Sequence, residues 1–235
     1  MSVRTSHPSL PSSPKTVASV ASAEYINGPF SNEESDIVEF RLDGLLPHLT
    51  DVKNSLLQLK NSQLQTLITA RCTSEGGISE LTAEQRSQLI MGLSPLATFV
   101  DIELANFETM REAVDFSQDM NSLVIASFHD FKKTPSQSTL RDKILHAVDS
   151  GADIAKLAVY HNSLDDVFQC AQLLQEGLPI AVSLMGMGPL APTSRLLYAQ
   201  LGSVLNYGFI GDKPTAPGQW PAKLLHQAIS QTTPF

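Results

Sequence analysis

Short runs of apolar and β-branched residues alternate along this chain with segments in which apolar positions recur every three or four residues. The first pattern predicts strands and the second predicts helices. Strands are expected at residues 15–20, 36–42, 65–71, 98–104, 122–128, 153–159, 179–184 and 202–207. Helices are expected at residues 49–59, 82–93, 107–116, 135–148, 164–175, 194–200 and 221–229.

This alternation predicts a parallel sheet, and eight strands favour closure into a single-domain α/β fold, the (β/α)8 TIM barrel. Asn27-Gly-Pro29 interrupts the chain before the second strand, so the first helix is expected to shrink to a turn. An open doubly wound sheet is the alternative fold. No glycine-rich phosphate motif follows the first strand, so a dinucleotide site has no support.

Composition and charge exclude several classes of protein. The chain is 42% hydrophobic and 17% charged, which is typical of a globular protein. A net charge of −8 argues against a nucleic-acid partner. No apolar run approaches the length of a transmembrane helix, so no membrane partner is expected. The two cysteines form no metal or redox motif and fit a reducing cytoplasm.

The first 14 residues are rich in serine and proline and lack the apolar segment of a secretory signal. We expect residues 1–14 to form a flexible tail and residues 15–235 to form the barrel.

The sixth predicted strand, Asp153-Ile-Ala-Lys-Leu-Ala-Val159, carries a lysine at its centre. Burying a cation is unfavourable, and burial favours the neutral amine, which is a nucleophile near pH 7. Lys156 could instead reach out to water along the strand, which is the more common behaviour of a single strand lysine. The polar residues on the other strands favour the first interpretation.

In a (β/α)8 barrel the active site lies at the carboxyl ends of the strands. Charged residues and a histidine cluster at these predicted ends: Glu39, Arg41, Arg71, Glu75, Asp101, Glu103, His129, Lys156 and Arg195. Any single pair could be a structural ion pair. Together, a histidine, a lysine and three arginines favour a site for an anion that carries a reactive carbonyl.

Each residue type suggests a role in such a site. Lys156 can form an imine with a ketone, and His129 has a suitable pKa to remove and return a proton. Glu75 is the nearest candidate to orient the imidazole, with Asp101 and Glu103 as alternatives. Arginine binds a carboxylate through two hydrogen bonds, which suits Arg195, Arg71 or Arg41. Met185 and Met187 could form apolar walls or simply fill the core.

An ordered set of motifs extends this interpretation. The motifs are Glu39-Phe-Arg-Leu-Asp43, Arg71 with Glu75-Gly-Gly77, Asp101-Ile-Glu103, Ser127-Phe-His-Asp-Phe131 with Thr134-Pro135, Lys156-Leu-Ala158, Ser183-Leu-Met-Gly-Met187, Ser194-Arg195 and Ala216-Pro-Gly-Gln219. In residues, order and spacing the chain resembles the type I 3-dehydroquinase family. Each motif is weak alone, but the set covers nearly the whole chain.

The resemblance implies a carbon–oxygen lyase that dehydrates 3-dehydroquinate to 3-dehydroshikimate, the third step of the shikimate pathway to chorismate and the aromatic amino acids. It implies an imine on Lys156 and a syn elimination in which His129, oriented by Glu75, removes the C2 proton and protonates the departing hydroxyl. The resemblance also implies substrate contacts from Arg195 and Gln219 to the carboxylate and from Glu39, Arg41 and Arg71 to the hydroxyls. No metal or organic cofactor is expected.

Three further substrate contacts are implied, at Ser19, Thr215 and Tyr207. Thr215 stands where many family members have serine, and Tyr207 adds a phenol where phenylalanine is common. Dimers are common in the family, so the resemblance also raises a homodimer. A class I aldolase barrel and a non-catalytic, metabolite-binding barrel are the competing interpretations.

Overall fold

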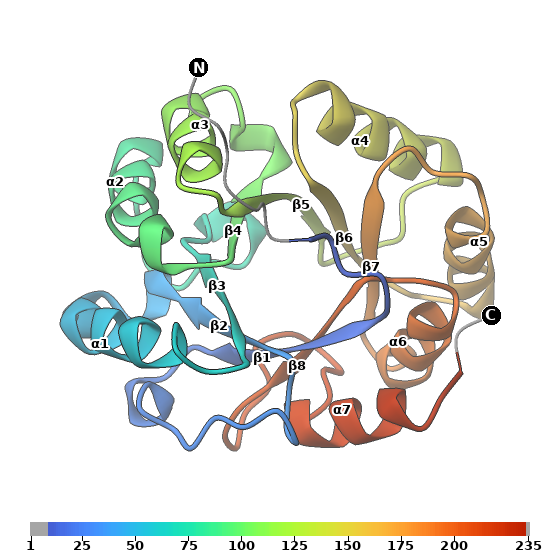
Figure 1. Cartoon of the computed structure of the whole chain (residues 1–235). Coiled ribbons are helices and arrows are strands. Elements are labelled where there is room, and N and C mark those ends of the chain that lie inside the picture. Colours follow the sequence, from blue (N-terminus) through green and yellow to red (C-terminus); the bar gives the residue numbers. More distant parts are fainter. Residues whose placement is uncertain (1–8, 234–235) are drawn as a thin grey trace.

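The computed structural model describes residues 9–233. Eight parallel strands surround the molecular axis, and helices cover their outer side (Figure 1). The strands are β1 Lys15–Val20, β2 Ile37–Arg41, β3 Gln65–Thr69, β4 Phe99–Glu103, β5 Leu123–Asp130, β6 Ile154–Tyr160, β7 Ala181–Met187 and β8 Leu205–Phe209. Their spatial order is β7-β6-β5-β4-β3-β2-β1-β8. This order confirms the single (β/α)8 barrel and excludes the open doubly wound sheet.

The ring closes between β7 and β8 through single hydrogen bonds. The backbone N–H of Val204 donates to the carbonyl of Val182 at 3.0 Å. The hydroxyl of Ser183 donates to the carbonyl of Leu205 at 2.6 Å. These contacts close the barrel so that side chains from distant strands share one interior.

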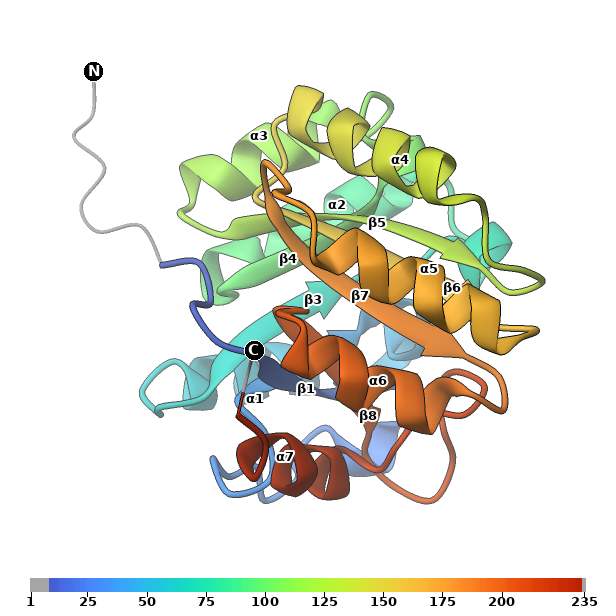
Figure 2. The ribbon, with the colours of Figure 1, turned by 90° about the vertical axis from the view of Figure 1, so that its right-hand side faces the viewer.

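Seven α-helices pack around the barrel in the part of the chain that the structure describes (Figure 2). They are α1 Leu49–Leu59, α2 Ala83–Leu93, α3 Arg111–Asp119, α4 Gln137–Asp149, α5 Leu164–Leu174, α6 Ala191–Gln200 and α7 Ala222–Ser230. The predicted capping box of α2 is present. The Thr82 side chain accepts from the Gln85 backbone N–H, and the Gln85 side chain accepts from the Thr82 backbone N–H. A 3₁₀ turn at Ala23–Tyr25 replaces the first helix, as predicted.

Several boundaries differ from the prediction. Helix α3 begins four residues later than expected, because the 3₁₀ turn Leu104–Asn106 comes first and Phe107 is buried as an anchor ahead of the helix. Helix α4 begins after Pro135, with Ser136 as its N-cap, so the proline lies outside the first turn. Helix α6 begins three residues earlier, since a proline is tolerated in its first turn.

Two apolar layers hold the barrel. One lies between the strands and the helices, and the other fills the barrel interior. The inner layer is made by strand residues that point to the axis, including Val17, Ile37, Leu67, Phe99 and Leu205. This layer blocks the amino-terminal end of the barrel, so the polar interior residues gather at the carboxyl ends of the strands.

The predicted tail falls mostly on residues 1–8, which lie outside the described residues. Residues 9–14 precede β1 and form neither helix nor strand. Within the described residues 9–233, no helix is long and apolar enough to span a bilayer.

Candidate active site

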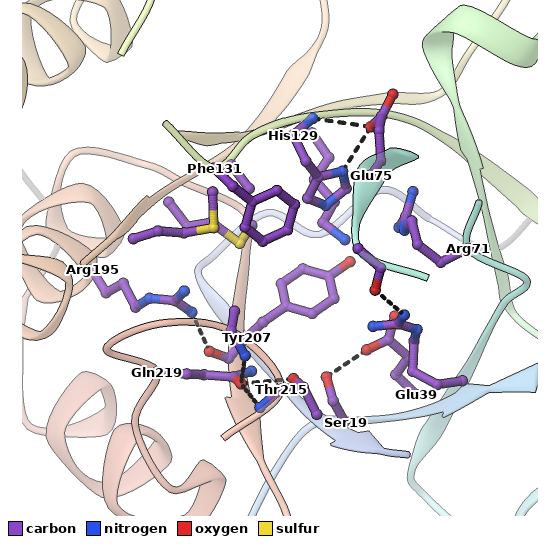
Figure 3. Close-up of a pocket in the computed structure, with 17 residues that line it drawn as sticks. Ser19, Glu39, Arg71, Glu75, His129, Phe131, Arg195, Tyr207, Thr215 and Gln219 are labelled. Atoms are coloured by element: carbon purple, nitrogen blue, oxygen red, sulfur yellow. Dashed lines mark hydrogen bonds and ion pairs between the residues drawn. The ribbon is translucent and has the colours of Figure 1, made fainter. Parts of the chain in front are cut away.

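A cavity opens at the carboxyl ends of the strands and encloses about 510 Å³ of space, including its mouth (Figure 3). Of the residues considered for the site, all but Asp101 and Glu103 line it: Ser19, Glu39, Arg41, Arg71, Glu75, His129, Lys156, Met185, Met187, Arg195, Tyr207, Thr215 and Gln219. The walls also include Gly76, Phe131, Ala158 and Ala216. The closed barrel thus brings together predicted residues from six strands, from the segment after β3, from α6 and from the loop after β8.

Lys156 points into the barrel and is only 4% exposed, so it does not reach out to water. Its Nζ donates to Oδ2 of Asp101 at 2.8 Å and lies 4.1 Å from the ring centre of Tyr207. Burial lowers the pKa of the lysine below its ordinary value, and the Asp101 carboxylate opposes that shift. The amine is therefore easier to deprotonate than an exposed lysine, although a carboxylate pairs with it at rest.

A buried carboxylate on β4 links this lysine to an arginine. Arg71 Nη2 lies 2.8 Å from Asp101 Oδ1, and Ser127 donates to the same oxygen at 2.6 Å. Burial alone would raise the pKa of Asp101, but the Arg71 guanidinium and the Lys156 ammonium hold it below its ordinary range. Asp101 is thus a fixed anion beside the amine and does not orient His129.

Glu103, the other alternative partner for the histidine, is also engaged elsewhere. It pairs with Arg71 at 3.3 Å and with Arg86 at 2.5 Å. Arg86 comes from α2, is 3% exposed, and was not among the predicted site residues. Arg86 lies on the buried face of α2 together with Ile90 and Leu93. An arginine among the apolar positions of a helix was therefore the sequence feature that could have indicated a buried ion pair.

His129 lies at the end of β5 against Glu75, which follows β3 (Figure 3). Oε2 of Glu75 accepts from the His129 backbone N–H at 3.0 Å and lies 2.9 Å from Nδ1 of the ring. A proton on Nδ1 donates to this carboxylate, so the lone pair of Nε2 is free to act as a base. Burial lowers the pKa of His129 well below its ordinary value, and nearby Arg71 adds to the effect.

Two neighbours fix the position of this pair. Phe131 stacks beside the imidazole, with ring centres 6.2 Å apart and planes 16° from parallel. Gly76 has a φ of +87°, and a Cβ there would lie 2.7 Å from the Phe131 ring. Only glycine suits both the left-handed backbone and the close approach of the aromatic ring.

The opposite side of the cavity is acidic and rich in hydroxyl groups. Glu39 on β2 accepts hydrogen bonds from Ser19 and, at 2.7 Å, from Thr69. Arg41 is held by Asp43 through two bonds of 3.0 and 2.9 Å and donates to the Gly76 carbonyl at 3.1 Å. These contacts fix Glu39 and Arg41 before any ligand enters, which suits recognition of a polyhydroxylated molecule.

Arg195 on α6 is 2% exposed, and no carboxylate forms an ion pair with it among residues 9–233. Its guanidinium donates to the backbone carbonyls of Gly186 at 3.2 Å and Tyr207 at 2.5 Å. Burial lowers its pKa to about 10. A buried guanidinium without a counter-charge is a strong site for an anionic ligand.

The loop between β8 and α7 supplies Gln219 beside Arg195 (Figure 3). Gln219 Oε1 accepts from the backbone N–H and the hydroxyl of Thr215, at 2.9 and 2.7 Å, and from the N–H of Ala216 at 3.2 Å. These donors occupy the oxygen, so the Nε2 hydrogens are the part of the amide available to a ligand. Among residues 9–233, no group of three or more histidine, cysteine or carboxylate side chains is arranged to hold a metal ion.

The arrangement combines three chemical capacities in one cavity. A sheltered amine can attack a carbonyl, an imidazole with a free Nε2 can move a proton, and an uncompensated guanidinium can hold a carboxylate. This combination suits an enzyme that forms an imine on an anionic ketone and removes a proton from the adjacent carbon.

Comparison with known proteins agrees with the family resemblance. Residues 17–233 match the family model for type I 3-dehydroquinase. The 3-dehydroquinate dehydratase of Methanocaldococcus jannaschii is 36% identical over 190 residues, covering 80% of this chain and 83% of the relative. That of Methanococcoides burtonii is 34% identical over 198 residues, covering 83% of this chain and 84% of the relative.

A crystal structure of 3-dehydroquinate dehydratase from Geobacillus kaustophilus is similar to this barrel, with a TM-score of 0.81 and 27% identity. The match covers 93% of this chain and 91% of that one. The family match spans nearly all of the barrel, including every strand that contributes to the cavity. The chain therefore belongs to the type I 3-dehydroquinase family.

Proposed function

We propose that this chain is a 3-dehydroquinate dehydratase, a carbon–oxygen hydro-lyase that converts 3-dehydroquinate to 3-dehydroshikimate and water. The observation that carries the proposal is the buried amine of Lys156 in the same cavity as the Nε2 of His129. Neither an aldolase nor a purely binding barrel is favoured by a contact in this cavity, and the family match supports the dehydratase.

Imine formation is the first step. The Lys156 ammonium gives a proton to Nε2 of His129, and the freed amine attacks the C3 ketone of the substrate. His129 then returns this proton to the carbinolamine hydroxyl, which leaves as water and restores a free Nε2. The resulting iminium can accept an electron pair from the neighbouring C2–H bond, so C2 becomes acidic. Asp101 stays ionised beside the new cation and stabilises it, in the way that it pairs with the resting ammonium.

Elimination is the second step. Nε2 of His129 removes the C2 proton, and the electron pair moves through the enamine to expel the C1 hydroxyl. His129 returns its proton to this hydroxyl, which leaves as water. Addition of water to the conjugated imine then releases the enone product and restores Lys156. The imine supplies the electron sink, so the proposed chemistry uses no metal or organic cofactor.

Substrate position follows from the charges on the walls. Arg195 and the Nε2 group of Gln219 bind the carboxylate on C1, since neither has a carboxylate partner among the described residues. Glu39, Arg41 and Arg71 bind the ring hydroxyls on the opposite side. Met185 and Met187 form the apolar wall beside the ring.

The direct test is ultraviolet absorbance of the conjugated enone when purified protein meets 3-dehydroquinate. The proposal predicts an increase in absorbance that depends on the amount of protein. Protein treated beforehand with borohydride and 3-dehydroquinate together, in which a reduced imine blocks the lysine, serves as the negative control. No absorbance change at micromolar protein and millimolar substrate would contradict the assigned activity.

Replacing Arg195 with glutamine is expected to raise KM by roughly 100-fold and to change kcat much less, because carboxylate binding is similar in the ground and transition states. The matched control is Arg141→Gln, because Arg141 on α4 pairs with Glu176 after α5, and neither residue lines the cavity. Steady-state kinetics with a thermal unfolding curve for each variant checks the prediction. An unchanged KM in a folded Arg195→Gln protein would remove this residue from the carboxylate site.

The pH dependence of kcat should follow Glu75. Burial raises the pKa of Glu75 to about 7, with Arg71 opposing the shift, and only the ionised carboxylate accepts the Nδ1 proton that leaves Nε2 free. We therefore expect kcat to fall as the pH drops below about 7. Glu75→Gln cannot titrate at this position, and burial lowers the pKa of His129, so the acid limb of the variant should move to lower pH. An acid limb that stays in place in Glu75→Gln would contradict this assignment.

The cytoplasmic location suggested by cysteine usage and a homodimer both stay predictions. The residues that line the cavity come from several elements of one chain.

A further inference from the structure

The phenol of Tyr207 is the unusual polar group of this cavity. Tyr207 is 4% exposed, and its hydroxyl is buried without a hydrogen-bond partner among residues 9–233. The other fully buried tyrosine, Tyr198, contacts His161 Nε2 at 2.8 Å and donates to the Val167 carbonyl at 3.2 Å. Buried polar groups nearly always have a partner, and residues 9–233 supply none for the Tyr207 hydroxyl, so a bound ligand is the candidate partner.

The place of the ring shows where this partner would be. Tyr207 stands on β8 and lines the cavity, with the Lys156 amine 4.1 Å from its ring centre. The ring extends from its strand toward the side of the cavity where Glu39 and Arg71 lie, and the hydroxyl is at the far end (Figure 3). Burial raises the pKa of this phenol well above its ordinary value, so the hydroxyl keeps its proton as a donor.

The chemistry of the proposed function then limits which substrate atom can meet it. The carbon bonded to Lys156 has two ring neighbours, C2 and C4. C2 must face His129, which removes its proton, so C4 lies on the other side of the imine, toward Glu39 and Arg71. We propose that the Tyr207 hydroxyl hydrogen-bonds the C4 hydroxyl of the bound substrate and makes this chain selective for it, an inference that rests on the proposed function.

The experiment pairs a conservative variant with a matched substrate. Tyr207→Phe removes only the hydroxyl, and an analogue of 3-dehydroquinate with hydrogen at C4 removes only its partner. With 3-dehydroquinate we expect kcat/KM of the variant to fall by about 10- to 100-fold, while with the 4-deoxy analogue wild type and variant should be equal. Because the hydroxyl has no hydrogen-bond partner in the described part of the chain, Tm of Tyr207→Phe should be unchanged or higher.

Tyr198→Phe is the contrasting control, because its hydroxyl bonds to the protein itself. It should lower Tm and affect both substrates equally. An unchanged kcat/KM for Tyr207→Phe, or an equal loss with both substrates, would overturn the role of Tyr207 while leaving the dehydratase assignment in place. Absence of turnover by the wild-type chain would contradict the dehydratase assignment, and the inference about Tyr207 would fall with it.

Discussion

Lys156→Ala is expected to lower kcat by on the order of 10⁴-fold or more, because no other group in the cavity can form the imine. The product dissociation constant should change by less than about tenfold, since Arg195 and Gln219 still hold the carboxylate. The fold should survive, because Asp101 keeps its bonds to Arg71 and Ser127. The enone assay measures turnover, and calorimetry measures binding.

The matched control is Lys143→Ala. Lys143 also lies over an aromatic ring, 3.9 Å from the centre of Phe128, but it stands on α4 outside the cavity. Its loss should leave kcat unchanged. Near-normal turnover by Lys156→Ala would show that the reaction does not pass through a covalent intermediate on this residue.

His129→Ala is expected to lower kcat by roughly 10²- to 10⁴-fold, the usual contribution of a positioned general acid–base group. The lysine remains, so substrate should still form the imine slowly, and this imine should accumulate because C2 keeps its proton. Borohydride reduction followed by mass spectrometry distinguishes the two states. The substrate adduct is heavier than the product adduct by one water.

We expect the substrate adduct to dominate in His129→Ala and the product adduct to be prominent in wild type. His146→Ala is the control, because His146 is exposed on α4 and should behave as wild type. A product adduct formed at the normal rate in His129→Ala would assign the proton transfer to another group.

Local patterns in the sequence were sufficient to predict the barrel and most of the cavity lining. Side chains alternate along a strand, so Glu39 with Arg41 and Asp101 with Glu103 were expected on shared faces. Closure of the strands then brings such faces together, and most of the residues expected at the site line one cavity. Their chemical roles are proposals that the variants above test.

The partners of these residues could not be predicted in the same way. Asp101 and Lys156 are 55 residues apart, and alternation along strands does not specify which carboxylate meets which cation. Asp101 and Glu103 were considered as partners of His129, but barrel geometry directs them to Lys156, Arg71 and Arg86. Helix ends also moved where buried Phe107 delays α3, because tertiary packing outweighs local preference there.

Borohydride trapping of the wild-type protein with 3-dehydroquinate, followed by peptide mass spectrometry, shows whether the substrate becomes an imine on Lys156. We expect one covalent adduct, located on the peptide that contains Lys156 and absent when substrate or borohydride is omitted. No mass gain on that peptide during active turnover, or an adduct on another lysine, would contradict catalysis through an imine at Lys156.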